Sequence, residues 1–163
     1  MGIRDEELKR VEKYCQALGI KVTYKKQGKT DPEAEWATDG SEITVYLRPK
    51  QSITQIILDL IHELGHHQAW VYNDRKTAIS LDNALGREKH NKKDRLAILK
   101  DEENGAEYHL MIYKELGLKI PEWKVRLERD LSLEIYRYYA KNNNWPTFKW
   151  RKEKKKELQE KLK

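Results

Sequence analysis

The chain has 163 residues, 37% of them charged and 38% hydrophobic, and a formal net charge of +6, which is the composition of one small globular domain with a modest core. Its single cysteine, Cys15, excludes an internal disulfide and favours a reducing compartment. The charged N-terminal region does not have the pattern of a secretory leader, and no run reaches the roughly 18 apolar residues of a membrane span, so we expect a cytoplasmic monomer with no membrane partner.

The first part of the chain predicts a helix followed by a small sheet. Residues 3–18 carry apolar side chains at helical spacing, and Gly19 follows where helices commonly end. Strand-like alternation then recurs in three segments, residues 21–27, 33–38 and 42–48. Asp39-Gly40 is a strong hairpin signal. We expect a three-stranded antiparallel sheet. If residues 42–48 form its exposed edge, an extended peptide can add to them as a further strand.

Residues 52–72 predict the helix around which the rest of the chain is organised. Isoleucine and leucine recur every three or four positions from Ile53 to Leu64, which is the pattern of an amphipathic helix. Ser52 and Gln55 fit a capping box at its start. This helix contains a His-Glu-x-x-His motif, His62-Glu63-Leu64-Gly65-His66.

The spacing of this motif predicts a zinc site. His62 and His66 lie one helical turn apart on the same face, so both imidazoles can reach a single ion. That face is opposite the apolar stripe, which predicts that the pair faces a cleft. Glu63 flanks the pair and is placed to take a proton from a metal-activated water rather than to bind the metal. His67 points back towards the apolar side, and we interpret it as a structural histidine.

A third ligand is expected from a later helix. Residues 73–93 show no clear periodicity and are interpreted as a connecting region, whereas residues 94–117 return to a helical pattern. We take the apolar stripe of this helix as Leu96, Leu99, position 103, Ala106, Leu110 and Tyr113. Position 103 is Glu103, and a divalent metal would offset the cost of burying its carboxylate. Glu102 lies off this stripe and is the weaker candidate.

Several roles in this helix stay open. Glu103 can instead be a solvent-exposed acid near the start of a helix capped by Asp101. Glu107, one turn further along, can hold the second nitrogen of a liganding imidazole or be an ordinary solvated residue. A donor for an oxyanion is also needed, and the sequence does not rank its candidates, Tyr108, His109, Tyr136 and His90.

The C-terminal part predicts one more helix, residues 121–141, and then a break. We therefore divide the chain into a domain, residues 1–141, and a tail, residues 142–163. Residues 149–163 hold eight basic and three acidic side chains, so the basic character belongs to the tail. Phosphate contact and base stacking would allow nucleic-acid binding through Trp150, Arg151, Lys152, Lys154 and Lys155. Interleaved glutamates at helical spacing favour a solvated or protein-docking helix instead.

The two motifs resemble those of a known group of enzymes. His62-Glu63-Leu64-Gly65-His66, followed by Glu103-Asn104-Gly105-Ala106-Glu107, is similar to the paired motifs of the gluzincin metallopeptidases, and in size and element order to the small ImmA/IrrE-like proteins of bacteria and their phages. The resemblance implies an α+β, zincin-like fold with Zn²⁺ held by His62, His66 and Glu103 and with Glu63 as the base. The acid that follows the glutamate ligand in the family is Asp, and here it is Glu107.

The resemblance and the zinc-site spacing together predict a zinc-dependent metallopeptidase that hydrolyses peptide bonds in a protein or peptide substrate. The alternative is a catalytically silent metal-binding regulatory protein that binds a repressor or a nucleic acid through its basic tail. Metal analysis combined with a protease assay separates these two hypotheses.

Overall fold

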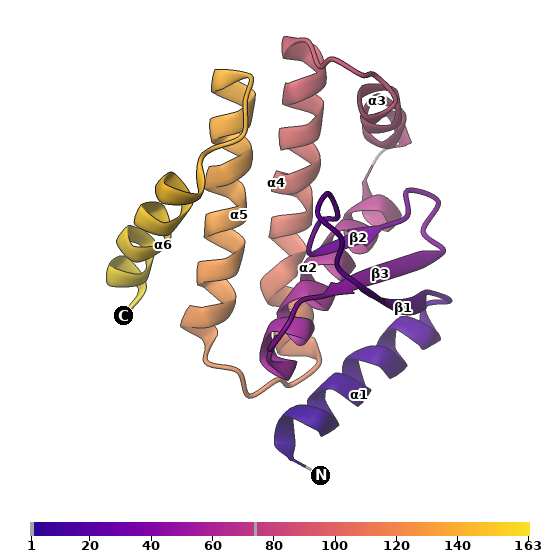
Figure 1. Cartoon of the computed structure of the whole chain (residues 1–163). Coiled ribbons are helices and arrows are strands. Elements are labelled where there is room, and N and C mark those ends of the chain that lie inside the picture. Colours follow the sequence, from indigo (N-terminus) through magenta and orange to yellow (C-terminus); the bar gives the residue numbers. More distant parts are fainter. Residues whose placement is uncertain (1, 74) are drawn as a thin grey trace.

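The computed structural model describes residues 2–73 and 75–163, with the backbone alone for residues 75–79. Met1 and Asp74, which belong to the predicted domain, lie outside the described residues. The described chain is α+β, with six helices and one three-stranded sheet (Figure 1). In order, the elements are α1 (Ile3–Ala17), β1 (Lys21–Lys26), β2 (Ala34–Trp36), β3 (Glu42–Leu47), α2 (Ile53–Tyr72), α3 (Arg75–Leu85), α4 (Lys92–Glu115), α5 (Glu122–Asn142) and α6 (Phe148–Leu162).

The sheet is mixed rather than antiparallel, which corrects the sequence-based expectation. The predicted hairpin is present, because β2 pairs antiparallel with β3 across a turn in which Gly40 has a φ of +78°. β1, however, pairs in parallel with the other side of β3, so the strand order is β1-β3-β2. β3 is therefore the central strand and not an exposed edge. Its residues 43–46 are all buried, as expected for a strand with a neighbour on each side.

The main core lies between the sheet, α1, α2 and α4. α2 supplies four of its fully buried side chains, Ile57, Leu60, Ile61 and Leu64. The predicted start of this helix is confirmed, because the Ser52 side chain accepts a hydrogen bond from the Gln55 backbone N–H at 3.1 Å. α2 is thus held on its apolar side, and its opposite face is left for the polar motif.

Two expectations about residues 73–117 are wrong. The segment interpreted as a connecting region contains α3. α4 begins earlier than predicted, at Lys92, where Asn91 and Asp94 form a capping box. Asp101 therefore lies in the middle of α4 and does not cap a helix.

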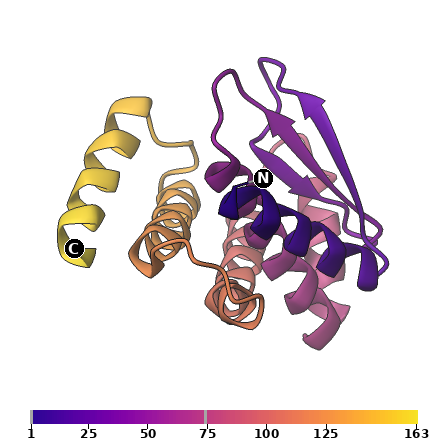
Figure 2. The ribbon, with the colours of Figure 1, turned by 90° about the horizontal axis from the view of Figure 1, so that it is seen from below.

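The C-terminal helices stack outward from the core. α5 packs on α4, and Figure 2 shows α6 on the outer side of α5, away from the sheet. The predicted tail is thus mostly helix, and every residue of α6 is exposed or half-buried. Within the described residues, no helix combines the length and the apolar character needed to cross a bilayer.

Candidate metal centre

The His-Glu helix places its two histidines at a cleft, on the face opposite its apolar stripe. His62, Glu63 and His66 all line this cleft, which has a volume of about 1250 Å³. The His62 side chain is 25% exposed, whereas Glu63 and His66 are buried. His67 points elsewhere and packs against Trp36 and Trp70, with ring centroids 6.3 and 5.8 Å away.

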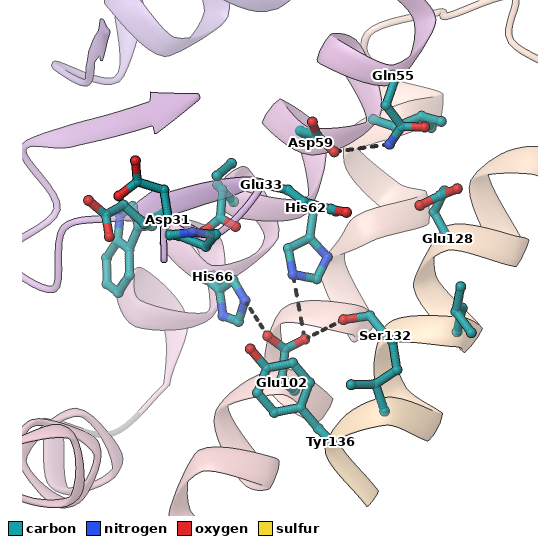
Figure 3. A pocket seen from close by; sticks show the side chains of 18 of the residues that line it. Asp31, Glu33, Gln55, Asp59, His62, His66, Glu102, Glu128, Ser132 and Tyr136 are labelled. Atoms are coloured by element: carbon teal, nitrogen blue, oxygen red, sulfur yellow. Dashed lines mark hydrogen bonds and ion pairs between the residues drawn. The ribbon is translucent and has the colours of Figure 1, made fainter. Parts of the chain in front are cut away.

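A carboxylate from α4 completes the group, and it belongs to Glu102. Its Oε1 lies 3.1 Å from His66 Nε2, and its Oε2 lies 3.5 Å from His62 Nε2 (Figure 3). One ligand atom from each of the three residues lies within 4.8 Å of the other two. Two imidazoles of one helix and an acid of another therefore converge on a common point in the cleft.

Two glycines allow α2 and α4 to approach closely enough for this convergence. A Cβ atom on Gly65 would lie 2.5 Å from the carbonyl oxygen of Gly105, a distance at which the backbones would have to separate. A Cβ atom on Gly105 would lie 3.0 Å from Nδ1 of His66. The crossing thus brings backbone against backbone at Gly65, and Gly105 leaves room for the His66 imidazole one turn after Glu102.

The carboxylate that the structure brings to the two histidines belongs to Glu102, whereas the sequence-based candidate for the α4 ligand is its neighbour Glu103. Glu103 is only half-buried and stands outside the group, and Glu107 is exposed. The two candidates differ because of the stripe chosen along the helix: Leu96, which set the register of the sequence-based stripe, is 49% exposed. The face that packs on the core consists instead of Ile98, Glu102, Gly105, His109 and Ile112. The signal for this register was Gly105, because helices cross most closely where a side chain is missing.

The charges of the triad depend on one another. Burial alone would lower the pKa of His66, but the neighbouring carboxylates of Glu102 and Asp101 raise it well above its ordinary value. Burial alone would raise the pKa of Glu102, but His62 and His66 lower it well below its ordinary value. Burial raises the pKa of Glu63, against the opposing effect of the two histidines. Glu102 is therefore held as a carboxylate, and Glu63, the other glutamate beside the two histidines, binds a proton more readily than Glu102 does.

Three further side chains that sequence reasoning did not place contact the triad. Asp101 Oδ2 lies 3.0 Å from His66 Nδ1, off the direction of an ideal hydrogen bond, so the contact is an ion pair. Ser132 of α5 donates a hydrogen bond from Oγ to Oε2 of Glu102 at 3.2 Å (Figure 3). Tyr136, one turn further along α5, lies beside Glu102 and lines the same cleft. Such contacts orient the groups that would bind a metal.

The geometry and the donor types fit a small divalent cation. Ligand atoms around a tetrahedral ion with bonds of about 2.0–2.1 Å are separated by about 3.3 Å. In the group, one ligand atom from each of the three residues lies within 4.8 Å of the other two, which is close enough for small shifts of the side chains to reach that separation. Two imidazole nitrogens and one carboxylate are donors that zinc accepts readily, and such a set leaves one position open for water.

The structure ranks the four candidates for an oxyanion donor. Tyr136 lines the cleft, and burial together with the Glu102 carboxylate raises its pKa well above the ordinary value, so its hydroxyl keeps its proton. His109 is 1% exposed and lies behind His62, with ring centroids 5.7 Å apart. Tyr108 stacks on Tyr72, and His90 contacts the Tyr139 hydroxyl. Tyr136 is therefore the candidate that faces the space beside the triad.

The aromatic and basic residues of the predicted tail are arranged as parts of a packed helix. Trp150 is half-buried against Tyr138, with ring centroids 4.9 Å apart. Lys154 lies over Trp150 and pairs with Glu157. Lys152 is exposed, whereas Arg151 and Lys155 line the cleft. The proposed nucleic-acid role of these five residues stays a prediction.

The edge of the sheet at the cleft is β2. Glu33 accepts a hydrogen bond from the Tyr46 backbone N–H, and the Ala37 N–H donates to Glu42, so these alternate positions point towards β3. In antiparallel pairing, the intervening residues Ala34 and Trp36 then direct their N–H and C=O groups away from β3. Both residues line the cleft. The outward backbone groups of β2 thus border the same space as the triad.

Comparisons of the chain with protein-family models, with curated proteins and with solved structures found no match. The resemblance to gluzincins therefore rests on the His-Glu-x-x-His motif, because the glutamate that lies at the site is Glu102, and the second motif was read from Glu103. The structure shows a His-His-Glu group whose ligand atoms lie within metal-binding distance of one another at a cleft.

Proposed function

We propose that the protein is a zinc-dependent peptidase in which His62, His66 and Glu102 hold the metal and Glu63 is the general base. The observation that carries this proposal is the convergence of the three ligand atoms within 4.8 Å of one another at a cleft that Glu63 also lines. A buried ion pair of histidines and glutamate can be purely structural. An acid with a raised pKa beside that pair, facing the same cleft, favours catalysis.

Each residue of the cleft has a role that follows from its position. A bound zinc ion would supply Lewis-acid chemistry, lowering the pKa of water and polarising a carbonyl group. Glu63 takes the proton from the attacking water at its carboxylate and passes it to the leaving amine, a task suited to an acid whose pKa is raised towards neutrality. The Tyr136 hydroxyl donates to the oxygen of the attacked carbonyl, where negative charge develops. Ser132 and Asp101 keep Glu102 and His66 in position.

The substrate is proposed to bind as an additional strand on β2. The outward N–H and C=O groups of Ala34 and Trp36 offer an extended peptide the hydrogen bonds of an antiparallel pair. This arrangement replaces the expectation that residues 42–48 receive the peptide, because those residues form the central strand. A peptide on β2 would lie in the cleft, with its backbone beside the triad.

The Glu63→Gln variant tests the catalytic part of this proposal. Removing a general base costs on the order of 10² to 10⁴ in rate, so cleavage of a mixture of short peptides, followed by mass spectrometry, should fall at least 100-fold. Zinc content should stay near one equivalent, because Glu63 is not a ligand. Glu157→Gln is a matched control, since that side chain is half-exposed on α6, far along the chain from the triad, and forms ion pairs with Lys154 and Lys161.

Three outcomes contradict the proposal in different ways. Undiminished turnover by purified Glu63→Gln protein rejects Glu63 as the base. Wild-type protein that holds zinc and cleaves nothing is the catalytically silent metal-binding protein. Wild-type protein that binds no zinc, cobalt or manganese at neutral pH rejects the metal centre itself.

A further inference from the structure

The two ends of the cleft differ in chemical character, on opposite sides of the triad. Asp59 lies about one turn before His62 on α2, and Glu128 lies one turn before Ser132 on α5. Both acids line the cleft at one end, where Figure 3 shows them on the side of His62 away from Tyr136. The other end begins at Tyr136 and is lined by apolar side chains.

The acidic end carries more negative than positive charge. Its acids are Asp31, Glu33, Asp59 and Glu128. Arg48 lies between Glu33 and Asp59, at 2.9 and 2.8 Å, and Lys155 pairs with Glu128 at 3.8 Å. Arg151 lines the cleft as well, so at most three bases face these four acids, in a protein whose overall charge is positive. The Glu33 side chain is 66% exposed and the Glu128 side chain 25%, so both can still receive a cation from solution.

The apolar end presents large side chains to the same space. Leu81 and Ile98 pack with Tyr139 and with Tyr136, next to the triad. Trp145 stacks on Tyr139, with ring centroids 4.0 Å apart, and the Trp145 residue is 47% exposed. Leu85 is 52% exposed and also lines the cleft. Exposed apolar surface that continues from a candidate reaction centre is a binding surface for an apolar side chain.

The direction of β2 orders these two ends along a bound peptide. β2 follows Glu33, which reaches the acidic end through Arg48, and it ends at Trp36, which packs on His67 and Trp70 near the end of α2. A peptide that pairs antiparallel with β2 runs the opposite way. Its N-terminal half then lies at the apolar end of the cleft, and its C-terminal half lies at the acidic end.

We infer that the cleft selects extended peptide segments in which a bulky apolar residue precedes the bond beside the triad and a basic residue follows it. The inference rests on the proposed function in one respect, that the bond beside the triad is the one cleaved. The preference for these peptides is a property of binding and can be measured without cleavage. The basic side chain reaches Glu33 and Glu128, and the apolar side chain is covered by Leu85, Ile98 and Trp145. This preference for an apolar and then a basic residue specifies the chemistry of the substrate that the cleft binds.

Binding to the zinc-loaded Glu63→Gln protein tests the inference without turnover. Four fluorescently labelled octapeptides of alanine and glycine differ only in their central pair, Leu-Lys, Leu-Glu, Lys-Leu or Ser-Lys. Fluorescence anisotropy should give the Leu-Lys peptide about tenfold higher affinity than Leu-Glu, and several-fold higher affinity than the other two. The advantage over Leu-Glu should shrink to about threefold when salt rises from about 50 to about 500 mM, because added ions screen partly exposed charges.

A charge variant locates the preference at the acidic end. Glu33→Gln combined with Glu128→Gln in the same protein should reduce the advantage of Leu-Lys over Leu-Glu to about twofold. Glu153→Gln combined with Glu157→Gln is the matched control, because it also removes two negative charges, but from the outer helix α6. The control should leave the ratio of the two affinities near tenfold.

The outcomes separate this inference from the peptidase proposal. Equal affinity for all four peptides, tighter binding of Leu-Glu, or no binding at about 1 mM overturns the inference. Selective binding of Leu-Lys with no cleavage by wild-type protein supports the inference and rejects the peptidase. Cleavage by wild-type protein that ignores the central pair supports the peptidase and rejects the inference.

Discussion

The two helices that form the candidate metal centre place their ligands by different means. In α2, His62 and His66 are neighbours because four residues make about one helical turn, so their relation is set within a single segment of the chain. In α4, Glu102 reaches the same point only because Gly65 and Gly105 let two helices touch. Half of the site is thus local in sequence, and half depends on a packing contact between residues 40 positions apart.

Hydrophobic periodicity is sufficient to predict the buried face of α2 but not that of α4. Along α2 the apolar stripe is long and uniform, so the direction opposite it is well determined. α4 has polar residues on its buried face, among them Asp94, Glu102, Asn104 and His109. A stripe drawn through apolar residues alone therefore selects the wrong register. The missing information is which residues lie at the helix crossing.

The largest expected effect separates Glu102 from its neighbour. Glu102→Gln should lower zinc affinity on the order of 100-fold or more, because it replaces one of three charged or strongly donating ligands. Glu103→Gln should change affinity by less than about twofold, since Glu103 lies outside the triad and the amide keeps its shape. Competition with a zinc chelator at neutral pH measures both. An equal loss in the two variants would remove the distinction between the adjacent glutamates.

Metal removal gives the same comparison a second readout. Zinc that binds only the folded protein raises its free energy of unfolding, by about 2.7 kcal/mol at a ligand concentration 100 times Kd. Chelation should therefore lower the melting temperature of wild-type protein and of Glu103→Gln. The Glu102→Gln protein should respond far less, because little metal is bound to remove.

Much of the fold and half of the site follow from the sequence for identifiable reasons. α1, α2 and α5 were predicted within one or two residues at each end, because their apolar stripes and caps lie within the segments themselves. The pairing of β1 with β3 was not, since either edge of a hairpin can accept a third strand and the choice depends on the helices that cover the sheet. Ser132 and Asp101 were not placed at the site, and Tyr136 was one of four unranked candidates, because their contacts cross between helices.

A substitution at Gly65 tests the point at which α2 and α4 cross. Gly65→Ala puts a methyl group 2.5 Å from the Gly105 carbonyl oxygen, so α2 and α4 must separate. Overpacking of this kind costs about 1–3 kcal/mol, and the better helix propensity of alanine offsets up to about 1 kcal/mol. Urea unfolding of the metal-free protein should show a net loss of about 1–2 kcal/mol. Zinc affinity should also fall, because Glu102 moves away from the histidines.

Gly86→Ala is the control for that substitution. A Cβ atom there would approach nothing closer than 3.4 Å, an ordinary contact with the Asp82 carbonyl oxygen. Its free energy of unfolding should stay within about 0.5 kcal/mol of wild type. If Gly65→Ala matches Gly86→Ala in both stability and zinc affinity, then the close approach of the two backbones does not position the α4 ligand.

The smallest expected effect concerns Asp101, whose carboxylate lies beside the second nitrogen of His66. A carboxylate on the second nitrogen of a liganding imidazole fixes the ring and strengthens its donation, and its loss lowers metal affinity about tenfold. Asp101→Asn should produce that loss with no change in zinc stoichiometry, whereas Asp130→Asn, whose carboxylate pairs with Arg129, should leave affinity unchanged. Asp101→Glu should recover part of the affinity, because it restores the charge but displaces it by one methylene. A recovery by Glu and not by Asn would assign the effect to the charge beside His66. Equal affinity in all three proteins would mean that α4 contributes to the metal centre through Glu102 alone.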